Sequence, residues 1–273
     1  MLLAAPEKAN DAESWVSTLN QRLFEVGGVS MRTPRPYIGS PELPGRRSYQ
    51  LAQKPARDGQ FQNCRYYWPD IVDPNFPYGE GLRLQLRSAV SHFNEVWAVE
   101  SAGAVLHAFA DDLPWEFVYD VARWTYDEAR HCRMGLARLS EWDYHPDEIP
   151  LGSYIYDSAR GQDPVVRLGQ LHFFETKNIG SKTKRMEAFA SYQDDMSQHD
   201  MDFDWADETI HAHYGRRWYD ALRELYPERI PDLKTVLNLC SDLIEQEIST
   251  ATDQDRTEIR NIAEAMINKA EEA

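Results

Sequence analysis

Two segments of the sequence place acidic residues and a histidine at matching positions. Each has the pattern Asp-Glu-x-x-His with a glycine four residues after the histidine, over residues 127–135 and 207–215. Because residues three apart lie on one face of a helix, the glutamate and the histidine of each copy can bind the same metal ion. The repeat therefore predicts four metal ligands, which are Glu128, His131, Glu208 and His211.

Two further glutamates fall on apolar stripes of neighbouring predicted helices. Glu100 shares a helical face with Trp97, and Glu175 shares one with Leu171. Glu95, in contrast, falls on the opposite side of its helix from Glu100, and we expect it to face solvent. A buried ionised carboxylate is costly without a counter-charge. Glu100 and Glu175 are therefore the two remaining predicted ligands.

Hairpin symmetry tests whether these groups can meet, because residues equidistant from the turn of a hairpin lie at the same height. The midpoint of Glu100 and Glu128 is Pro114, inside the first predicted turn. The midpoint of Glu175 and Glu208 falls at the edge of the second predicted turn. At a rise of about 1.5 Å per residue, each pair lies about 21 to 25 Å from its loop. The six groups are therefore expected to form one layer.

The elements that must hold these groups are two helical hairpins within residues 82–222. Residues 112–114 and 192–197 interrupt the helical pattern and predict the two turns, with Ser197 as the N-cap of the last helix. Residues 145–164 between the hairpins are long enough for a crossover rather than a tight turn. No strand-like alternation competes with the helical pattern, so an all-α fold is expected.

The rest of the chain is expected to surround these hairpins. Residues 11–27 have the spacing of an amphipathic helix, and residues 31–81 carry eight prolines and irregularly spaced aromatic residues. We expect an extended arm that packs on the bundle, with a lid over the site or a dimer strap as alternatives. The predicted parts are an N-terminal helix and arm (1–81), a bundle (82–225) and a C-terminal helical extension (226–273).

The complete ligand pattern has a known counterpart. One glutamate from each of two helices and a Glu-x-x-His pair from each of two others is the ligand set of di-iron and di-manganese carboxylate bundles. Over roughly residues 82–225, the sequence resembles the ferritin-like carboxylate dimetal superfamily. The resemblance implies a ferritin-like four-helix bundle with a long crossover. It also implies two metal ions, with iron favoured and Fe/Fe, Mn/Fe and Mn/Mn pairs all allowed.

The resemblance also assigns roles to individual residues. It makes Glu100 and Glu175 terminal ligands, Glu128 and Glu208 bridges, and the two histidines one nitrogen ligand for each metal. A metal-bound imidazole needs an acceptor for its other N–H. In similar proteins an aspartate reaches across to the histidine of the opposite copy. The expected pairs are Asp127 with His211 and Asp207 with His131.

Three other side chains are candidates to line the site. His107 lies two helical turns from Glu100, about 10 Å along the axis, and is a candidate for a substrate channel. His172 precedes Glu175 by three residues, and Tyr214 follows His211 by three. Core packing or a surface position is the alternative for the two histidines, and core packing is the alternative for Tyr214.

Oxygen and nitrogen ligands suit iron and manganese, which react with dioxygen or peroxide. The first hypothesis is an oxidase or oxygenase that activates O₂ to oxidise a small organic substrate, with an electron donor and a second copy of the chain as further candidate partners. The alternatives are a ferroxidase or metal-storage protein and a manganese catalase or peroxidase. One fold serves many reactions, so the substrate is not specified by the ligands.

Composition limits the classes of partner and the cellular compartments that we expect for this protein. The formal charge is −16, from 29 basic and 45 acidic residues, and this field repels nucleic acid, including the tRNA that one branch of similar proteins modifies. The three cysteines are widely spaced and favour a reducing compartment. No basic leader or long apolar run is found, so a cytoplasmic protein without membrane contact is expected.

Overall fold

Helices dominate the described part of the chain, which is residue 54 and residues 57–272 of the computed structural model. The elements below belong to one compact unit, residues 53–55 and 59–273. The expectation of a mostly helical fold is confirmed. The helix predicted over residues 11–27, and most of the arm before residue 57, lie outside the described residues. The helices are α2 (Leu82–Phe93), α3 (Val96–Phe109), α4 (Trp115–Ser140), α5 (Tyr154–Ser158), α6 (Pro164–Ser191), α7 (Asp195–Leu225), α8 (Leu233–Ser249) and α9 (Asp253–Glu272).

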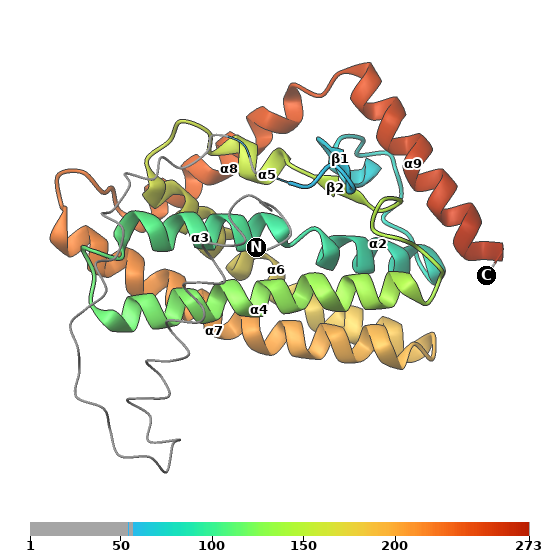
Figure 1. The fold of residues 1–273 in the computed structure, drawn as a ribbon, viewed down its shortest axis with the longest axis horizontal. Helices are drawn as coiled ribbons and strands as arrows, with labels where there is room; N and C mark the ends of the chain where they lie inside the picture. Colours follow the sequence, from blue (N-terminus) through green and yellow to red (C-terminus); the bar gives the residue numbers. More distant parts are fainter. Residues whose placement is uncertain (1–53, 55–56, 273) are drawn as a thin grey trace, which may run out of the picture. The chain divides into compact units, whose positions relative to one another are not determined.

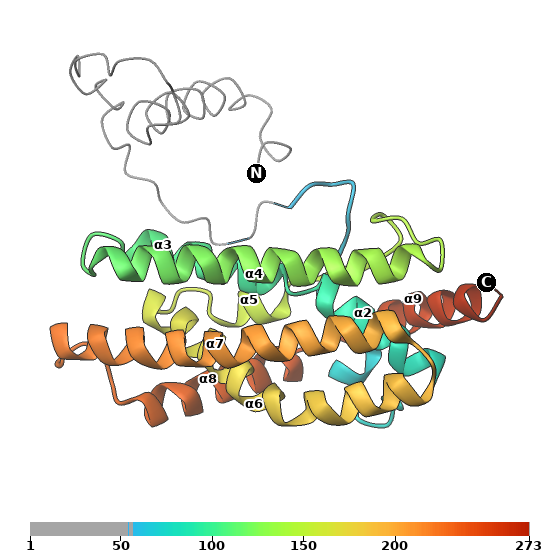
Figure 2. The same ribbon diagram turned by 90° about the horizontal axis from the view of Figure 1, so that it is seen from below.

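The long helices form two hairpins that pack side by side, as Figures 1 and 2 show. In one hairpin α2 and α3 pack against α4, and in the other α6 packs against α7. Contacts of α3 with α6 and of α4 with α7 join the two. Each of these helices contributes apolar side chains to the common core, among them Val90, Val105, Phe117, Leu168 and Leu222. Burying a side chain of this size contributes about 1.5 to 3 kcal/mol.

Both predicted turns are present, and their bounds have local causes. α3 ends at Phe109 and α4 begins directly after Pro114, whose fixed φ suits the residue ahead of a helix. α7 begins at Asp195, earlier than the sequence indicated. The reason is that the Asp194 side chain accepts a hydrogen bond from the Ser197 N–H at 3.0 Å. The N-cap is therefore Asp194 and not Ser197.

The first long helix is interrupted between α2 and α3, at Asn94 and Glu95. Asn94 is buried, and its amide donates hydrogen bonds to the carbonyl oxygens of Val90 and Pro150, both at 2.8 Å. Its Oδ1 accepts a hydrogen bond from the Gly152 N–H at 2.7 Å. The amide therefore ties the break to the crossover segment. The break also changes which side chains of the following helix face inward.

Replacing Asn94 by alanine is expected to lower the free energy of unfolding by about 2 kcal/mol, because buried backbone groups then lose their hydrogen bonds. Urea denaturation measures the change. Asn261, which is exposed on α9, provides the matched control, and Asn261→Ala should stay within about 0.5 kcal/mol of the parent protein. Equal effects of the two substitutions would contradict the structural role given to Asn94.

Two short strands, which the sequence did not predict, form a parallel pair. β1 (Gln62–Cys64) pairs with β2 (Pro150–Gly152) of the crossover segment. Each strand spans three residues, which is too short for an alternating pattern to be recognised. Just after β1, Tyr66 and Trp68 are buried in the common core. The described end of the predicted arm therefore packs on the helices.

The glycine of each repeat lets two helices approach closely. A Cβ on Gly135 of α4 would lie 2.4 Å from the backbone nitrogen of Phe93 and 2.5 Å from the carbonyl oxygen of Ala89, both in α2. A Cβ on Gly215 of α7 would lie 2.8 Å from the Cβ of His172 in α6. Each hairpin therefore depends on a glycine at this position.

The C-terminal helices pack on the outside of the hairpins. α8 contacts α5 and α6, and α9 contacts α2 and the short 3₁₀ helix η2 (Pro69–Ile71). The C-terminal helices therefore add to the packing around α2, α5 and α6.

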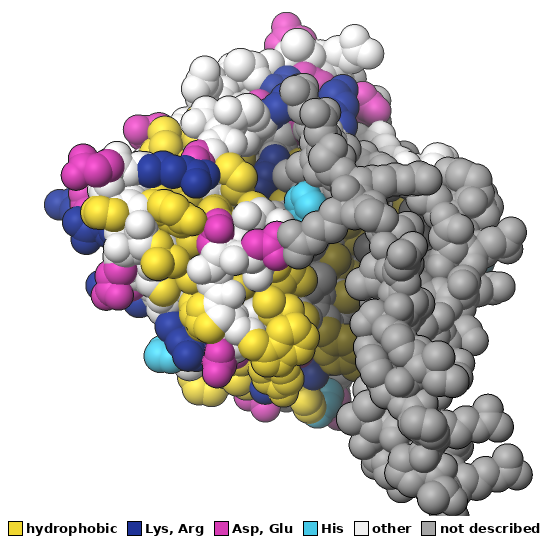
Figure 3. All heavy atoms as spheres, turned by 60° about the vertical axis from the view of Figure 1, so that its left-hand side comes forward, with side chains coloured by type: hydrophobic (Ala, Val, Ile, Leu, Met, Phe, Trp, Pro, Cys, Tyr) yellow, Lys and Arg dark blue, Asp and Glu magenta, His cyan; other side chains and the backbone are white. Residues whose placement is uncertain are grey.

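Large apolar side chains are exposed on the outer face of α4. Trp115, Tyr119 and Tyr126 are 74, 63 and 68% exposed, and their spacing places them on one helical face. Figure 3 shows hydrophobic side chains spread among charged ones over one side of the molecule. No described helix combines the length and apolar composition that crossing a membrane requires.

Candidate metal centre

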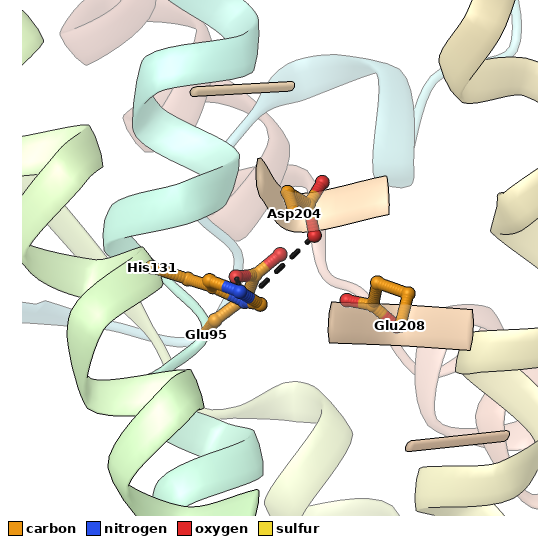
Figure 4. Close-up of side chains that lie close together, drawn as sticks. All are labelled: Glu95, His131, Asp204 and Glu208. Atoms are coloured by element: carbon orange, nitrogen blue, oxygen red, sulfur yellow. Dashed lines mark ion pairs between the residues drawn. The ribbon is translucent and has the colours of Figure 1, made fainter. Parts of the chain in front are cut away.

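Four side chains from three segments form the first of two clusters with metal-ligating atoms. The ligand atoms of Glu95, His131, Asp204 and Glu208 all lie within 4.8 Å of one another. Glu95 stands at the break before α3, His131 lies on α4, and the other two lie on α7. Figure 4 shows the four side chains pointing toward one another from these elements.

The second cluster overlaps the first. It consists of Glu128, Glu175, Glu208 and His211, again with all ligand atoms within 4.8 Å of one another. Glu208 belongs to both clusters. Glu128 also reaches both, because its Oε2 lies 3.5 Å from Nδ1 of His131 and its Oε1 lies 3.2 Å from Nδ1 of His211. Both glutamates of the repeat therefore lie between the two histidines.

Positive charge is needed within these clusters. Burial, together with the charges of Glu128 and Glu95, raises the pKa of Glu208 well above its usual range. Burial acts in the same direction on Glu128, but close contacts with the His131 and His211 rings outweigh it and lower its pKa to about 2. Burial by itself would lower the pKa of His211. The carboxylates of Asp127 and Glu128 outweigh burial and raise this pKa to about 9. Protons on the histidines thus supply charge that metal ions would supply instead.

Four buried ligand atoms of the clusters have no hydrogen-bond partner among the described residues. They are Nδ1 of His131, Nδ1 of His211, Oε2 of Glu95 and Oε2 of Glu208. The two atoms from His131 and Glu95 lie 3.0 Å apart, but their orientation does not make a hydrogen bond. A buried polar atom without a partner is costly. Metal ions would satisfy all four atoms, so the clusters fit metal ions.

The crosswise contacts expected between aspartates and histidines are present. Nε2 of His131 lies 3.0 Å from Oδ2 of Asp207, and Nε2 of His211 lies 3.4 Å from Oδ2 of Asp127. Each contact uses the ring nitrogen remote from the cluster, so it orients Nδ1 toward the ligand position. Arg130 bonds to Asp207 and lies 3.4 Å from Asp127, and so holds both carboxylates.

Replacing Asp127 by alanine is expected to weaken metal binding at the second cluster by about 10- to 100-fold, because His211 loses the acceptor that orients it. Titration against a competing chelator measures the dissociation constants. Asp220→Ala on α7 is the control, since the Asp220 side chain is 43% exposed and forms an ion pair with Arg216, which is also exposed. Unchanged affinity in the Asp127→Ala protein would contradict this role.

The structure corrects the position predicted for one ligand. Glu100 is in neither cluster. It lies partly buried in α3, where its charge acts on Arg167 of α6. Glu95, which was expected to face solvent, takes the place beside His131. The physical reason is the break at Asn94, because the prediction extended one regular helix through it.

Sequence reasoning also missed Asp204 and Lys182. Both are buried, and Nζ of Lys182 lies 2.5 Å from Oδ1 of Asp204 and 3.2 Å from Oε1 of Glu208. A signal for each was available. Asp204 precedes Glu208 by four residues, and Lys182 follows Glu175 by seven, so each shares a helical face with a ligand.

The two halves of the site differ at one equivalent position. Four residues before the glutamate, one copy of the repeat has Trp124 and the other has Asp204. The Trp124 indole donates hydrogen bonds to Oε1 of Glu128 at 2.9 Å and of Glu175 at 3.2 Å. Its ring stacks on His211, with 5.2 Å between the ring centroids. The second cluster is therefore packed by an aromatic ring where the first has a carboxylate.

The three candidate lining residues lie elsewhere. His107 is exposed on α3, and neither it nor His172 lines the cavity described below. His172 is buried instead against Gly215, and burial lowers its pKa. Tyr214 does not line the cavity either, although its ring centroid is 6.4 Å from that of His211.

A cavity of about 260 Å³ adjoins both clusters. Glu128, Glu175 and Glu208 form part of its wall, together with Asp204. Tyr78, which is 38% exposed, also lines it, so the cavity reaches the surface. A small molecule that enters this cavity would contact the candidate ligands directly.

A family model described as "Protein of unknown function (DUF455)" matches residues 46–253 of the chain. This range contains every residue of both clusters and of the cavity wall. No curated protein and no solved structure matches the chain.

Proposed function

The chain belongs to the DUF455 family, and from its site we propose that it is a ferritin-like dimetal carboxylate oxidase or oxygenase. In this proposal two metal ions, with iron favoured, occupy the two clusters. When bound, such ions would supply open coordination positions for O₂ and would pass electrons to it, so that O₂ is reduced while a small organic molecule loses electrons and is oxidised. The nitrogen and oxygen donors of the clusters suit iron and manganese.

The single observation that carries the proposal is the overlap of the two clusters at Glu208. Because of this overlap, Glu208 could help to hold both ions, and Glu128 lies within 3.5 Å of a histidine of each cluster. Glu95 and Asp204 would complete one position with His131, and Glu175 would complete the other with His211. The packing of two helical hairpins around these groups supports the ferritin-like assignment.

The chain's own residues would prepare the reaction in three ways. Asp127 and Asp207 orient the histidines. The Trp124 indole fixes Glu128 and Glu175 by hydrogen bonds. Lys182 lines the cavity with Nζ 2.5 Å from Oδ1 of Asp204 and 3.2 Å from Oε1 of Glu208, so it holds these two carboxylates in place at the wall where the substrate would bind.

The cavity favours an enzyme with an organic substrate over the two alternatives. Its volume of about 260 Å³ exceeds what a single metal ion or hydrogen peroxide needs. The cavity also extends beyond the candidate ligands, to Tyr78 and Arg185, where metal ions bound at the clusters would not fill it. The cavity therefore supports oxidation of a small molecule.

Metal analysis of the full chain, purified without added metal and then loaded anaerobically with ferrous iron, tests the proposal. We expect about two ions per chain and an optical change when O₂ is admitted. Fewer than one ion per chain under every loading condition, or no oxygen-dependent change, would overturn it. Assembly into a large shell with further iron uptake would favour storage instead.

A further inference from the structure

The side chains that line the cavity change from acidic to basic with distance from the metal clusters. Along α6, Glu175, Asn178, Lys182 and Arg185 line it in succession, as one face of a helix would. Arg185 lies ten residues beyond Glu175, about 15 Å along the axis. The acidic end of the cavity is thus followed by a basic end.

The same change occurs along α2. Arg87 of α2 lines the cavity eight residues before Glu95, which stands at the break that follows this helix. Its guanidinium carbon lies 5.4 Å from the ring centroid of Tyr78, and that of Arg185 lies 5.6 Å from it. The two arginines therefore flank one exposed tyrosine at the outer end of the cavity.

Arg87 retains a nitrogen with no partner. Its Nε and Nη2 donate to the carboxylate of Asp70 at 2.9 and 3.2 Å, and its guanidinium rests on Tyr67, 5.1 Å from the ring centroid. Nη1 is buried without a hydrogen-bond partner among the described residues, and the whole residue is only 6% exposed. A buried guanidinium nitrogen left in this state requires an acceptor.

The charge balance of the cavity indicates which kind of group would accept a hydrogen bond from Nη1 of Arg87. Five carboxylates line it, and two divalent ions would offset four of them. Arg87, Lys182 and Arg185 then outnumber the remaining carboxylate and Asp70. With metals bound, the cavity is therefore positive inside a chain of formal charge −16, and it would concentrate anions.

We propose that the substrate is a small organic anion whose carboxylate or phosphate group binds Arg87 and Arg185 at the outer end of the cavity. Its uncharged end would then reach Glu128, Glu175 and Glu208. Arginine suits such oxyanions because it offers several N–H donors in one plane. The inference rests on the proposed function for the metal ions and adds the class of substrate.

Calorimetric titration of the metal-loaded full chain tests this inference with three probes. Hexanoate carries a carboxylate, butyl phosphate carries a phosphate, and hexanol is their neutral analogue. We expect at least one anion to bind ten-fold or more tightly than hexanol, and the better anion identifies the group. If neither anion binds more tightly than hexanol, the inference is wrong.

Variants locate the binding group. Arg87→Gln and Arg185→Gln are each expected to weaken anion binding at least ten-fold without changing hexanol binding. Arg216→Gln, at an exposed arginine of α7 outside the cavity wall, removes the same charge and should leave binding unchanged. Because Arg87 also packs on Tyr67, Arg185→Gln keeps the test valid if the first variant does not fold. Equal losses in all three variants would overturn the inference.

Metal content measured on the same samples separates the two proposals. Metal-loaded protein that binds neither anion overturns the substrate class and leaves the dimetal site in place. If the protein takes up no metal, the proposed function is wrong, and the inferred substrate class is then wrong as well.

Discussion

Replacing Glu208 by alanine is expected to abolish binding of both metal ions, because this carboxylate belongs to both clusters. Its Oε2 is buried without a partner among the described residues. Burial and neighbouring carboxylates raise its pKa, so its negative charge depends on a bound cation. Metal content per chain after loading and desalting should fall from two ions to a small fraction of one.

Glu95→Ala and Glu100→Ala form a matched pair for the same measurement. The first substitution removes a member of the first cluster and should reduce the content to one ion. The second removes a carboxylate of the same charge, five residues further along, and should leave both ions bound. Helix content by circular dichroism confirms that each variant is folded. The opposite ranking would show that the helix break does not select the ligand.

Gly135→Ala is expected to lower the free energy of unfolding by about 3 kcal/mol or more, through steric overlap. The new Cβ would meet backbone atoms of α2 at 2.4 and 2.5 Å, and these cannot move without disturbing the hydrogen bonds of that helix. Urea denaturation measures the loss, and metal content should fall as the α2 to α4 contact is forced apart.

Two other helical glycines control for the substitution itself. At Gly103 of α3 and Gly180 of α6, an added Cβ would have no described atom of another part of the chain within 4 Å. Alanine there should stabilise the protein by about 0.5 to 1 kcal/mol, because glycine is a poor helix former. A Gly135→Ala protein as stable as these would mean that α2 and α4 are further apart than described.

The repeat was the most informative part of the sequence because it encodes local geometry. The spacing of Glu128 from His131, and of Glu208 from His211, depends only on the helical period. Glu208 and His211 share one cluster, and Glu128 of that cluster lies 3.5 Å from His131 of the other. The crosswise aspartates followed from the chemistry of a metal-bound imidazole. Local periodicity therefore predicted most of the candidate site.

Glu95 could not be predicted in this way because its position depends on a contact distant in sequence. Hairpin symmetry did not distinguish it from Glu100, since the midpoint of Glu95 and Glu128 falls between Asp111 and Asp112, also in the turn. The break is held by hydrogen bonds of Asn94 with the crossover. Tertiary contacts of this kind leave no period in the sequence.

Asp204 and Lys182 were not predicted from the sequence for a different reason. The repeat drew attention to positions that the two copies share, and Asp204 stands where the other copy has Trp124. Lys182 carries a charge opposite to that expected of a metal site, yet it is buried against Asp204 and Glu208. A search restricted to ligand residue types misses such partners.

The link between Asn94 and the crossover also bears on the order of folding. Each hairpin joins helices that are neighbours in sequence, and local contacts of this kind form rapidly. Asn94 must instead meet Pro150, 56 residues away, in a segment that pairs with the still earlier β1. Such distant contacts form late, because loop closure costs entropy before they stabilise anything. The contacts that join the two hairpins at the site span still more residues, 76 for His131 with Asp207, so the metal centre is expected to assemble after each hairpin has formed.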